Sequence, residues 1–340
     1  MSEANQLYSF NIDTDSLEHD LESQLDHYQQ RVDTLLQQPS FNWDNLMTPL
    51  ADLDHEFNRF WTPANHLNSV NNTEDIRKSY NQCIPKISNF FSNMSQNKQL
   101  FSAIQQINDH ADNLSQAQQT ILKHDIRDFT LSGVNLVEDK KQEFKNLTTR
   151  LSTLTTKFEE NVLDATEAWS KLITNENELA GLPDYAINLA RQFAEQKNKS
   201  GYLLTLQIPC YVAVMQYADN SELRKEMHQA YCTRASDQGP NANEFDNSNV
   251  MVDILTTRHQ LAKLLDFDHY AQYSLATKMI KQPQKVLDFL WELVDKSFAH
   301  AQQDKADLIQ FAKEQLQMKS LEPWDVSYVS EKLKQQHYNI

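Results

Sequence analysis

Glycine is almost absent from this chain, and that absence constrains its fold more than any other feature. Only four of the 340 residues are glycine: Gly133, Gly181, Gly201 and Gly239. Average usage of about 7% would give roughly 24. Glycine-rich phosphate loops need several glycines close together, so nucleotide binding of that kind is excluded. The tight turns of β-hairpins also depend on glycine. The scarcity therefore favours an architecture built mainly from helices.

The apolar residues recur with helical spacing along most of the chain. The segment 140–169 is the clearest example, because its apolar residues follow one another at intervals of three and four. They are Phe144, Leu147, Leu151, Leu154, Phe158, Val162, Ala165 and Trp169. This pattern predicts one long helix with a single apolar face. We expect that face to pack against the protein core; a dimerising coiled coil is the alternative, but the repeat is short for one.

Further helices are expected wherever the same period appears between turn signals. The predicted segments are 17–36, 75–93, 117–130, 184–198, 221–235, 247–265, 284–316 and 325 to the end, with breaks at Pro39, Pro63, 181–183 and 237–241. Thr73 and Asn220 have the side chains of helix N-caps. Only the segment 200–209 departs from the helical period, and it is predicted to be extended. The predicted fold class is therefore all-α, with at most a short extended segment near 201–209.

Charge and cysteine content limit the possible partners and the compartment. Acidic residues outnumber basic ones by 47 to 31, which gives a net charge of −16. Such a chain repels nucleic acid and anionic membranes, so we expect neither as a partner. The three cysteines indicate no disulfide framework, and we expect Cys210 and Cys232 to be buried thiols. Since the start of the chain lacks a signal-peptide pattern, we expect a cytoplasmic protein.

One short segment partly matches a zinc-binding motif. Metallopeptidases bind zinc through two histidines one helical turn apart, with a glutamate that acts as general base. This chain has His55-Glu56-Phe57-Asn58-Arg59, in which the second histidine is replaced by an arginine that cannot bind a metal. We interpret the segment as a surface helix in which Glu56 and Arg59 meet. No catalytic residue and no metal ligand is predicted in this chain.

The segment 231–241, Tyr-Cys-Thr-Arg-Ala-Ser-Asp-Gln-Gly-Pro-Asn, is the richest polar cluster in the sequence. Its Gly-Pro turn follows a predicted helix, so the segment is interpreted first as a capped helix end. Loops of this kind also line binding sites, and a wall or hinge of a ligand cleft is the alternative.

The same segment begins an extended resemblance to a known enzyme family. The sequence resembles the thimet oligopeptidase-like zinc metallopeptidases over nearly its whole length. The matching segments are 131–136, 157–164, 201–206, 223–227, 233–241, 246–248, 258–262, 274–279 and 323–325. The sequence departs from the family pattern at Asp266, where the family usually has glycine.

The resemblance implies a two-lobed helical peptidase with a deep channel that admits only short peptides. In that family one zinc ion is held by the two histidines of His-Glu-x-x-His and by a more distant glutamate, and those residues belong to the C-terminal half. The resemblance therefore implies an N-terminal helical domain over 1–180. The start of the peptidase catalytic domain follows over 181–340 and stops before the zinc motif. The substrate-binding residues stay unknown.

Two functional hypotheses follow from this comparison. In the first, the chain is the N-terminal portion of a zinc-dependent oligopeptidase. It supplies part of the channel wall, binds no zinc alone, is inactive by itself, and has short peptides and the missing C-terminal half as partners. In the second, it is a non-catalytic helical module that binds peptides or another partner. A coiled-coil scaffold unrelated to peptidases would rest on the segment 140–169 alone.

Overall fold

The computed structural model describes residues 9–338, and these form two compact units. The first unit combines the chain up to Thr155 with Ile254–Lys281, and the second combines Thr156–Asp253 with the chain from Gln282 onwards. Two helices, α6 (Glu138–Ala168) and α10 (Ser248–Leu264), contribute residues to both units. The sequence predicts a different division, into an N-terminal helical domain over 1–180 and the start of a peptidase domain over 181–340. That division stays a prediction.

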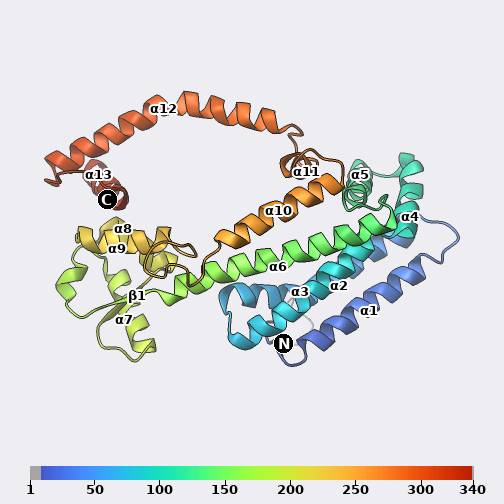
Figure 1. Cartoon of the computed structure of the whole chain (residues 1–340), viewed down its shortest axis with the longest axis horizontal. Helices are drawn as coiled ribbons and strands as arrows, with labels where there is room; N and C mark the ends of the chain where they lie inside the picture. The colour runs from blue at the N-terminus through green and yellow to red at the C-terminus, as the bar shows by residue number, and fades with distance from the viewer. Residues whose placement is uncertain (1–8, 339–340) are drawn as a thin grey trace. The chain divides into compact units, whose positions relative to one another are not determined.

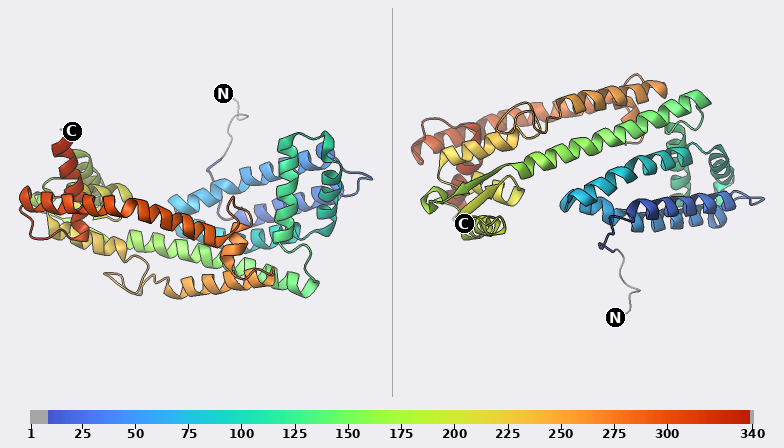
Figure 2. Two further views of the ribbon diagram at one scale, coloured as in Figure 1. Left: turned by 90° about the horizontal axis from the view of Figure 1, so that it is seen from above. Right: turned by 60° about the horizontal axis from the view of Figure 1, so that its bottom comes forward.

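The first unit consists of helices around one apolar core. Helices α1, α2 and α3 lie side by side, as the views in Figures 1 and 2 show. The apolar stripe of α1, which includes Leu21 and Val32, is buried in this core. The elements are α1 (Leu17–Leu35), the π-helix η2 (Trp43–Met47), α2 (Thr48–Val70), α3 (Glu74–Ser95), α4 (Lys98–Asp109), η3 (Ala111–Asn113), α5 (Gln116–Leu131) and α11 (Tyr270–Leu275), with parts of α6 and α10.

Helix α6 confirms the long helix predicted from the apolar repeat. Within the first unit its Phe144 is buried in a cluster with Leu261 and Leu264 of α10, and Leu147 and Leu151 pack against them. This part of the stripe therefore packs within the first unit, as expected.

The second unit contains the two strands in the described part of the chain. β1 (Ser170–Ile173) pairs antiparallel with β2 (Tyr202–Thr205), so that Ser170 lies opposite Thr205. The extended segment near 201–209 is confirmed for β2, but Pro209 lies in the first turn of the next helix, where its missing N–H costs nothing. The other elements are η4 (Glu176–Leu179), α7 (Asp184–Gln196), α8 (Ile208–Tyr217), α9 (Ser221–Cys232), α12 (Pro283–Glu314), η5 (Pro323–Asp325) and α13 (Val326–Tyr338).

The structure confirms both predicted helix caps. The side chain of Thr73 accepts a hydrogen bond from the backbone N–H of Ile76 at the start of α3. The side chain of Asn220 accepts hydrogen bonds from two N–H groups in the first turn of α9. These bonds satisfy backbone donors that the helix itself leaves without a partner. The all-α prediction is thus confirmed.

Four local predictions were wrong. Residues 200–209 were expected to be the only extended segment, whereas Ser170–Ile173 forms a second strand. Pro63 does not end a helix but lies buried inside α2, where the packing of the unit outweighs one lost backbone hydrogen bond. Helix α9 ends at Cys232, three residues before the predicted end at Ala235, and the positive φ of 50° places Ala235 outside the helical region. Cys210 is buried as expected, whereas Cys232 is exposed, since it lies at the open end of α9.

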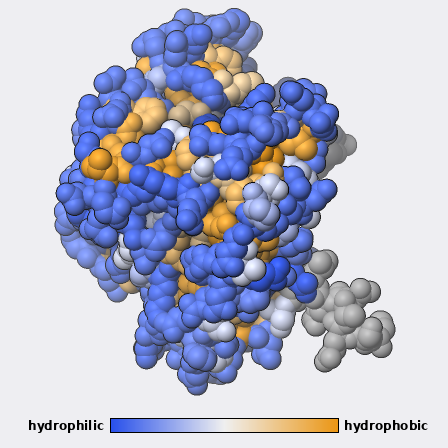
Figure 3. Space-filling view, turned by 90° about the vertical axis from the view of Figure 1, so that its right-hand side faces the viewer, coloured by the Kyte–Doolittle hydropathy of each residue, from blue (hydrophilic) through white to orange (hydrophobic). Residues whose placement is uncertain are grey.

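The surface is largely hydrophilic, in agreement with the charge of the chain. Figure 3 shows one side of the molecule, where apolar groups are visible between hydrophilic side chains. Within residues 9–338, no helix combines the length and the apolar composition that a membrane crossing requires.

Candidate functional site

The partial zinc motif lies on the surface of α2. The carboxylate of Glu56 is 4.0 Å from the imidazole of His27, and both side chains are more than half exposed. The expected contact between Glu56 and Arg59 stays a prediction. In the described part of the chain, no three His, Cys, Asp or Glu side chains converge as a metal site would require. The residues present therefore do not fit a catalytic zinc ion.

The polar segment 231–241 folds back against its neighbours in the second unit. The Arg234 guanidinium lies 3.6 Å from the ring centre of Tyr231 and donates a hydrogen bond of 2.8 Å to Thr166 Oγ1. The Tyr231 ring stacks in turn on Tyr211, with 3.9 Å between ring centres. These contacts are those of a helix end that is fixed by side-chain packing. They agree with the first interpretation of the segment, and a role in a ligand cleft stays a prediction.

A buried ion pair connects α9 with the segment before α13. The guanidinium of Arg224 bonds the carboxylate of Asp325, and only 1% and 3% of the two side chains is exposed. Arg224 also donates to the carbonyl oxygen of Ala218 at 2.5 Å and lies 4.1 Å from the ring centre of Tyr328. Ser221 donates to the same carboxylate at 3.0 Å. Sequence reasoning missed this pair because 101 positions separate the two residues, and no local pattern connects them.

Helix α12 carries an apolar face that is largely exposed among the described residues. Leu287, Leu290, Trp291, Val294 and Phe298 follow one another at helical spacing, and each side chain is at least 43% exposed. A helix with an apolar stripe of this width normally packs it against another element. Exposed apolar surfaces of this kind indicate an interaction site. We refer to these five residues as the α12 face.

Two family models match the chain in separate regions. The model described as Neurolysin/Thimet oligopeptidase, N-terminal domain, matches residues 15–141, which includes helices α1 to α5. The model described as Peptidase family M3 matches residues 214–340, which includes the buried Arg224–Asp325 pair and the α12 face. Together the two matches confirm the family resemblance found in the sequence.

Individual relatives extend the match across both regions. The chain is 47% identical over 302 residues to oligopeptidase A of Salmonella typhimurium, an alignment that covers 88% of this chain and 44% of the relative. It is 46% identical over 302 residues to oligopeptidase A of Escherichia coli, with the same coverage. It is 35% identical over 331 residues to the probable cytosolic oligopeptidase A of Arabidopsis thaliana, covering 94% of this chain and 45% of that protein. The chain thus spans less than half of the length of these relatives.

Proposed function

This chain belongs to peptidase family M3, and from that premise we propose that it is one portion of a zinc-dependent oligopeptidase that hydrolyses short peptides. It contributes the helices of the N-terminal lobe and part of the channel wall. The observation that carries this proposal is the collinear match to oligopeptidase A, which runs through both family regions at 47% identity.

The catalytic zinc belongs to a different portion of the enzyme under this proposal. The only His-Glu pair in the chain, His55-Glu56, is followed by Arg59 instead of a second histidine. Three protein ligands are needed for a catalytic zinc site, and residues 9–338 offer no such group. We therefore assign no step of peptide hydrolysis to this chain, and we expect it to bind no stoichiometric zinc alone.

The partner of this chain is the portion of the peptidase that carries the zinc site, and the α12 face is its docking surface. Support comes from the position of this face within the M3 match and from its exposed Trp291 and Phe298. Large aromatic side chains that become buried contribute most of the energy of a typical interface. We place the assembled enzyme in the cytoplasm, and its acidic charge argues against nucleic acid as a further partner.

Reconstitution from two portions tests the proposal directly. We would combine this chain with the part of Escherichia coli oligopeptidase A that follows the aligned region. Hydrolysis of an internally quenched peptide and the zinc content are then measured. We expect peptide hydrolysis, with one zinc per complex, only when both portions are present. Cleavage of peptides by this chain alone, with tightly held zinc, would contradict the proposal.

A pair of charge variants on α12 locates the docking surface. Trp291→Glu places a carboxylate within the α12 face and is expected to weaken the association at least about tenfold. His300→Glu is the matched control, because nine residues correspond to about two and a half helical turns and place the new carboxylate on the opposite side. Equal effects of the two variants would exclude the α12 face as the docking surface.

The same preparations address the second functional hypothesis. A non-catalytic binding module would melt cooperatively by itself and bind peptides saturably without the second portion. It would also bind them with unchanged affinity after Trp291→Glu if the α12 face were not its binding surface.

A further inference from the structure

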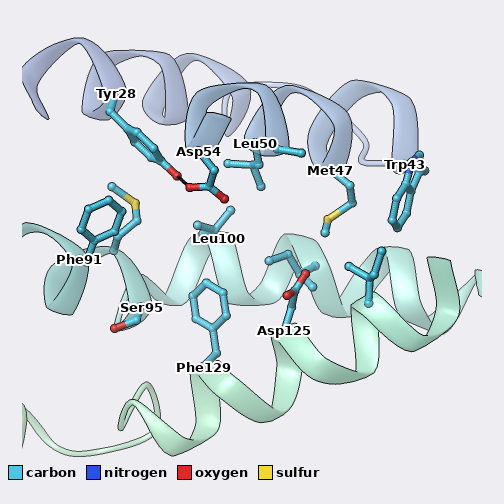
Figure 4. A pocket seen from close by; sticks show the side chains of 14 residues that line it. Tyr28, Trp43, Met47, Leu50, Asp54, Phe91, Ser95, Leu100, Asp125 and Phe129 are labelled. Carbon is cyan, nitrogen blue, oxygen red and sulfur yellow. Dashed lines mark hydrogen bonds between the residues drawn. The ribbon is translucent and has the colours of Figure 1, made fainter. Parts of the chain in front are cut away.

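An open cavity of 440 Å³ lies in the first unit, within the region that the Neurolysin/Thimet oligopeptidase N-terminal domain model matches. It is partly enclosed by α1, α2, η2, α3, α4 and α5 and opens to solvent, and Figure 4 shows the side chains that line it. Most of the lining is apolar, with Trp43, Phe91 and Phe129 among the larger groups. Ligand pockets in proteins are of about this size, from roughly 300 to 1,000 Å³, and usually combine an apolar wall with a few polar groups.

Two carboxylates are the charged groups of this cavity. Asp54 of α2 and Asp125 of α5 point into it from opposite walls, as Figure 4 shows. The hydroxyl of the buried Tyr28 donates a hydrogen bond of 2.7 Å to Asp54 Oδ1 and fixes the orientation of that carboxylate. The structure gives the Asp125 carboxylate no hydrogen-bond or ion-pair partner among residues 9–338. The cavity therefore contains negative charge without a matching cation.

Partial burial shifts the pKa of Asp125. It raises the pKa of this carboxyl to about 6, and the negative charges of Asp128 and Asp54 act in the same direction. Electrostatic interactions with His124 and Arg127 of α5 lower the pKa of Asp125 and oppose the shift only in part. Of the other helices, α1 contributes only Tyr28 as a titratable group and α2 only Asp54, while η2, α3 and α4 contribute none to the lining. A bound cation would remove the cost of ionising Asp125 in this environment.

We propose that this cavity binds an organic ammonium group carried on an aromatic or aliphatic body. The ammonium lies between Asp54 and Asp125, where each carboxylate accepts a charge-assisted hydrogen bond, and the apolar body packs among Trp43, Phe91 and Phe129. The two chemical requirements of the ligand follow directly from the two kinds of lining group. A free amine and the N-terminus of a peptide with an aromatic first residue both present this chemistry. The proposal does not depend on peptidase activity, because the cavity lies within residues 28–129.

Calorimetry or ligand-observed NMR on the complete 340-residue chain tests the proposal. The probes are 2-phenylethylamine, its uncharged analogue 2-phenylethanol and the anion 3-phenylpropionate, all at pH 8. We expect the amine to bind at least about tenfold more tightly than the alcohol, since only the amine carries a positive charge that the two carboxylates attract, and the anion not to bind. The tripeptide Phe-Gly-Gly and its N-acetylated form show whether a peptide N-terminus also enters. Equal binding of amine and alcohol, or no binding of any amine, would overturn the proposal.

Variants separate this cavity from binding elsewhere on an acidic surface. Asp125→Asn keeps the shape of the side chain, removes the charge, and is expected to weaken amine binding about tenfold or more. Asp52→Asn is the matched control, because it removes one charge from an exposed position of α2 outside the lining. Ala51→Phe fills the cavity without changing its charge and is expected to abolish binding of every probe. An unchanged affinity in Asp125→Asn and Ala51→Phe would show that the amine binds elsewhere.

The pH profile adds a readout that a general surface attraction would not produce. The amine stays protonated between pH 5 and pH 8, whereas Asp125 loses its proton with a pKa of about 6. We therefore expect about tenfold weaker binding at pH 5 than at pH 8, and no such change in Asp125→Asn. A flat profile for the unchanged protein would contradict the role of Asp125.

Discussion

Removal of the charge on Asp325 is expected to destabilise the second unit strongly. Asp325→Asn leaves the Arg224 guanidinium buried, with 1% of its side chain exposed, and without a counter-ion. One nitrogen of that guanidinium, Nε, already has no hydrogen-bond partner within residues 9–338. Loss of one partner from a buried ion pair typically costs about 3–5 kcal/mol. That is a large share of the roughly 5–15 kcal/mol by which a typical protein is stable.

The cost arises from the uncompensated charge, so replacing both residues together should recover much of it. The double variant Arg224→Met with Asp325→Leu removes both charges and fills the space with apolar groups, which is often neutral for a buried pair. We expect this double variant to be more stable than Asp325→Asn alone. Lys296→Met is the surface control: its ion pair with Glu292 joins side chains that are 72% and 60% exposed, and its loss should not change stability measurably.

Urea unfolding followed by circular dichroism measures the free-energy difference between these variants. Hydrogen exchange read by mass spectrometry assigns the change to a region, and faster exchange is expected in α9 and in η5 with the adjoining start of α13, since the pair connects α9 with η5. The reasoning is refuted if Asp325→Asn costs less than about 1 kcal/mol, because the burial of Arg224 would then carry no appreciable penalty. It is also refuted if the double variant is less stable than Asp325→Asn.

Three further substitutions test local features of the backbone and of one carboxyl. Asp266, just after the end of α10, has a φ of +63°, a conformation that favours glycine. Asp266→Gly should therefore stabilise the chain by about 0.5–1 kcal/mol in thermal melts. The control Asp268→Gly should give no gain. Asp125→Asn should raise the free energy of unfolding by about 1–3 kcal/mol at pH 8 but not at pH 4. The pKa of Asp125 is about 6 in the folded protein and 3.8 ordinarily, so the original chain loses stability as the pH rises from about 4 to about 6. An equal gain at both pH values would contradict this. Gly239→Ala should lower the free energy of unfolding by more than about 1 kcal/mol, because the φ of this residue is +81° and an added Cβ would lie 1.9 Å from Thr233 Oγ1. A melting temperature equal to that of the original chain would contradict the expected clash.

Local patterns were sufficient to predict most of the secondary structure. The apolar repeat of 140–169 predicted α6 because a helix buries one face at a fixed spacing, and Thr73 and Asn220 predicted helix starts because their side chains accept from nearby N–H groups. The same local reasoning failed at Pro63. Its effect depends on the packing around the whole of α2, which neighbours in sequence do not reveal.

The departure at Asp266 shows how a sequence comparison and a backbone angle support each other. The resemblance to the family implies glycine at this position, and the structure places Asp266 in a left-handed conformation at the end of α10. The backbone N–H of Phe267 bonds the carbonyl of Ala262, and that of Asp266 bonds Lys263, as in a Schellman motif. The comparison identified an unusual residue, and the structure supplied the physical reason.

The sequence by itself determined the helical architecture, the family, and the absence of a His-Glu-x-x-His motif from these 340 residues, because each of these properties is written in composition, periodicity or a continuous run of residues. Only the tertiary structure decided which distant residues meet. It paired Arg224 with Asp325, left the α12 face exposed, and brought Tyr28, Asp54 and Asp125 around one cavity. Such contacts arise when separate helices bury their apolar faces together, and the spacing of residues within any one helix does not specify which side chains of another helix will lie opposite.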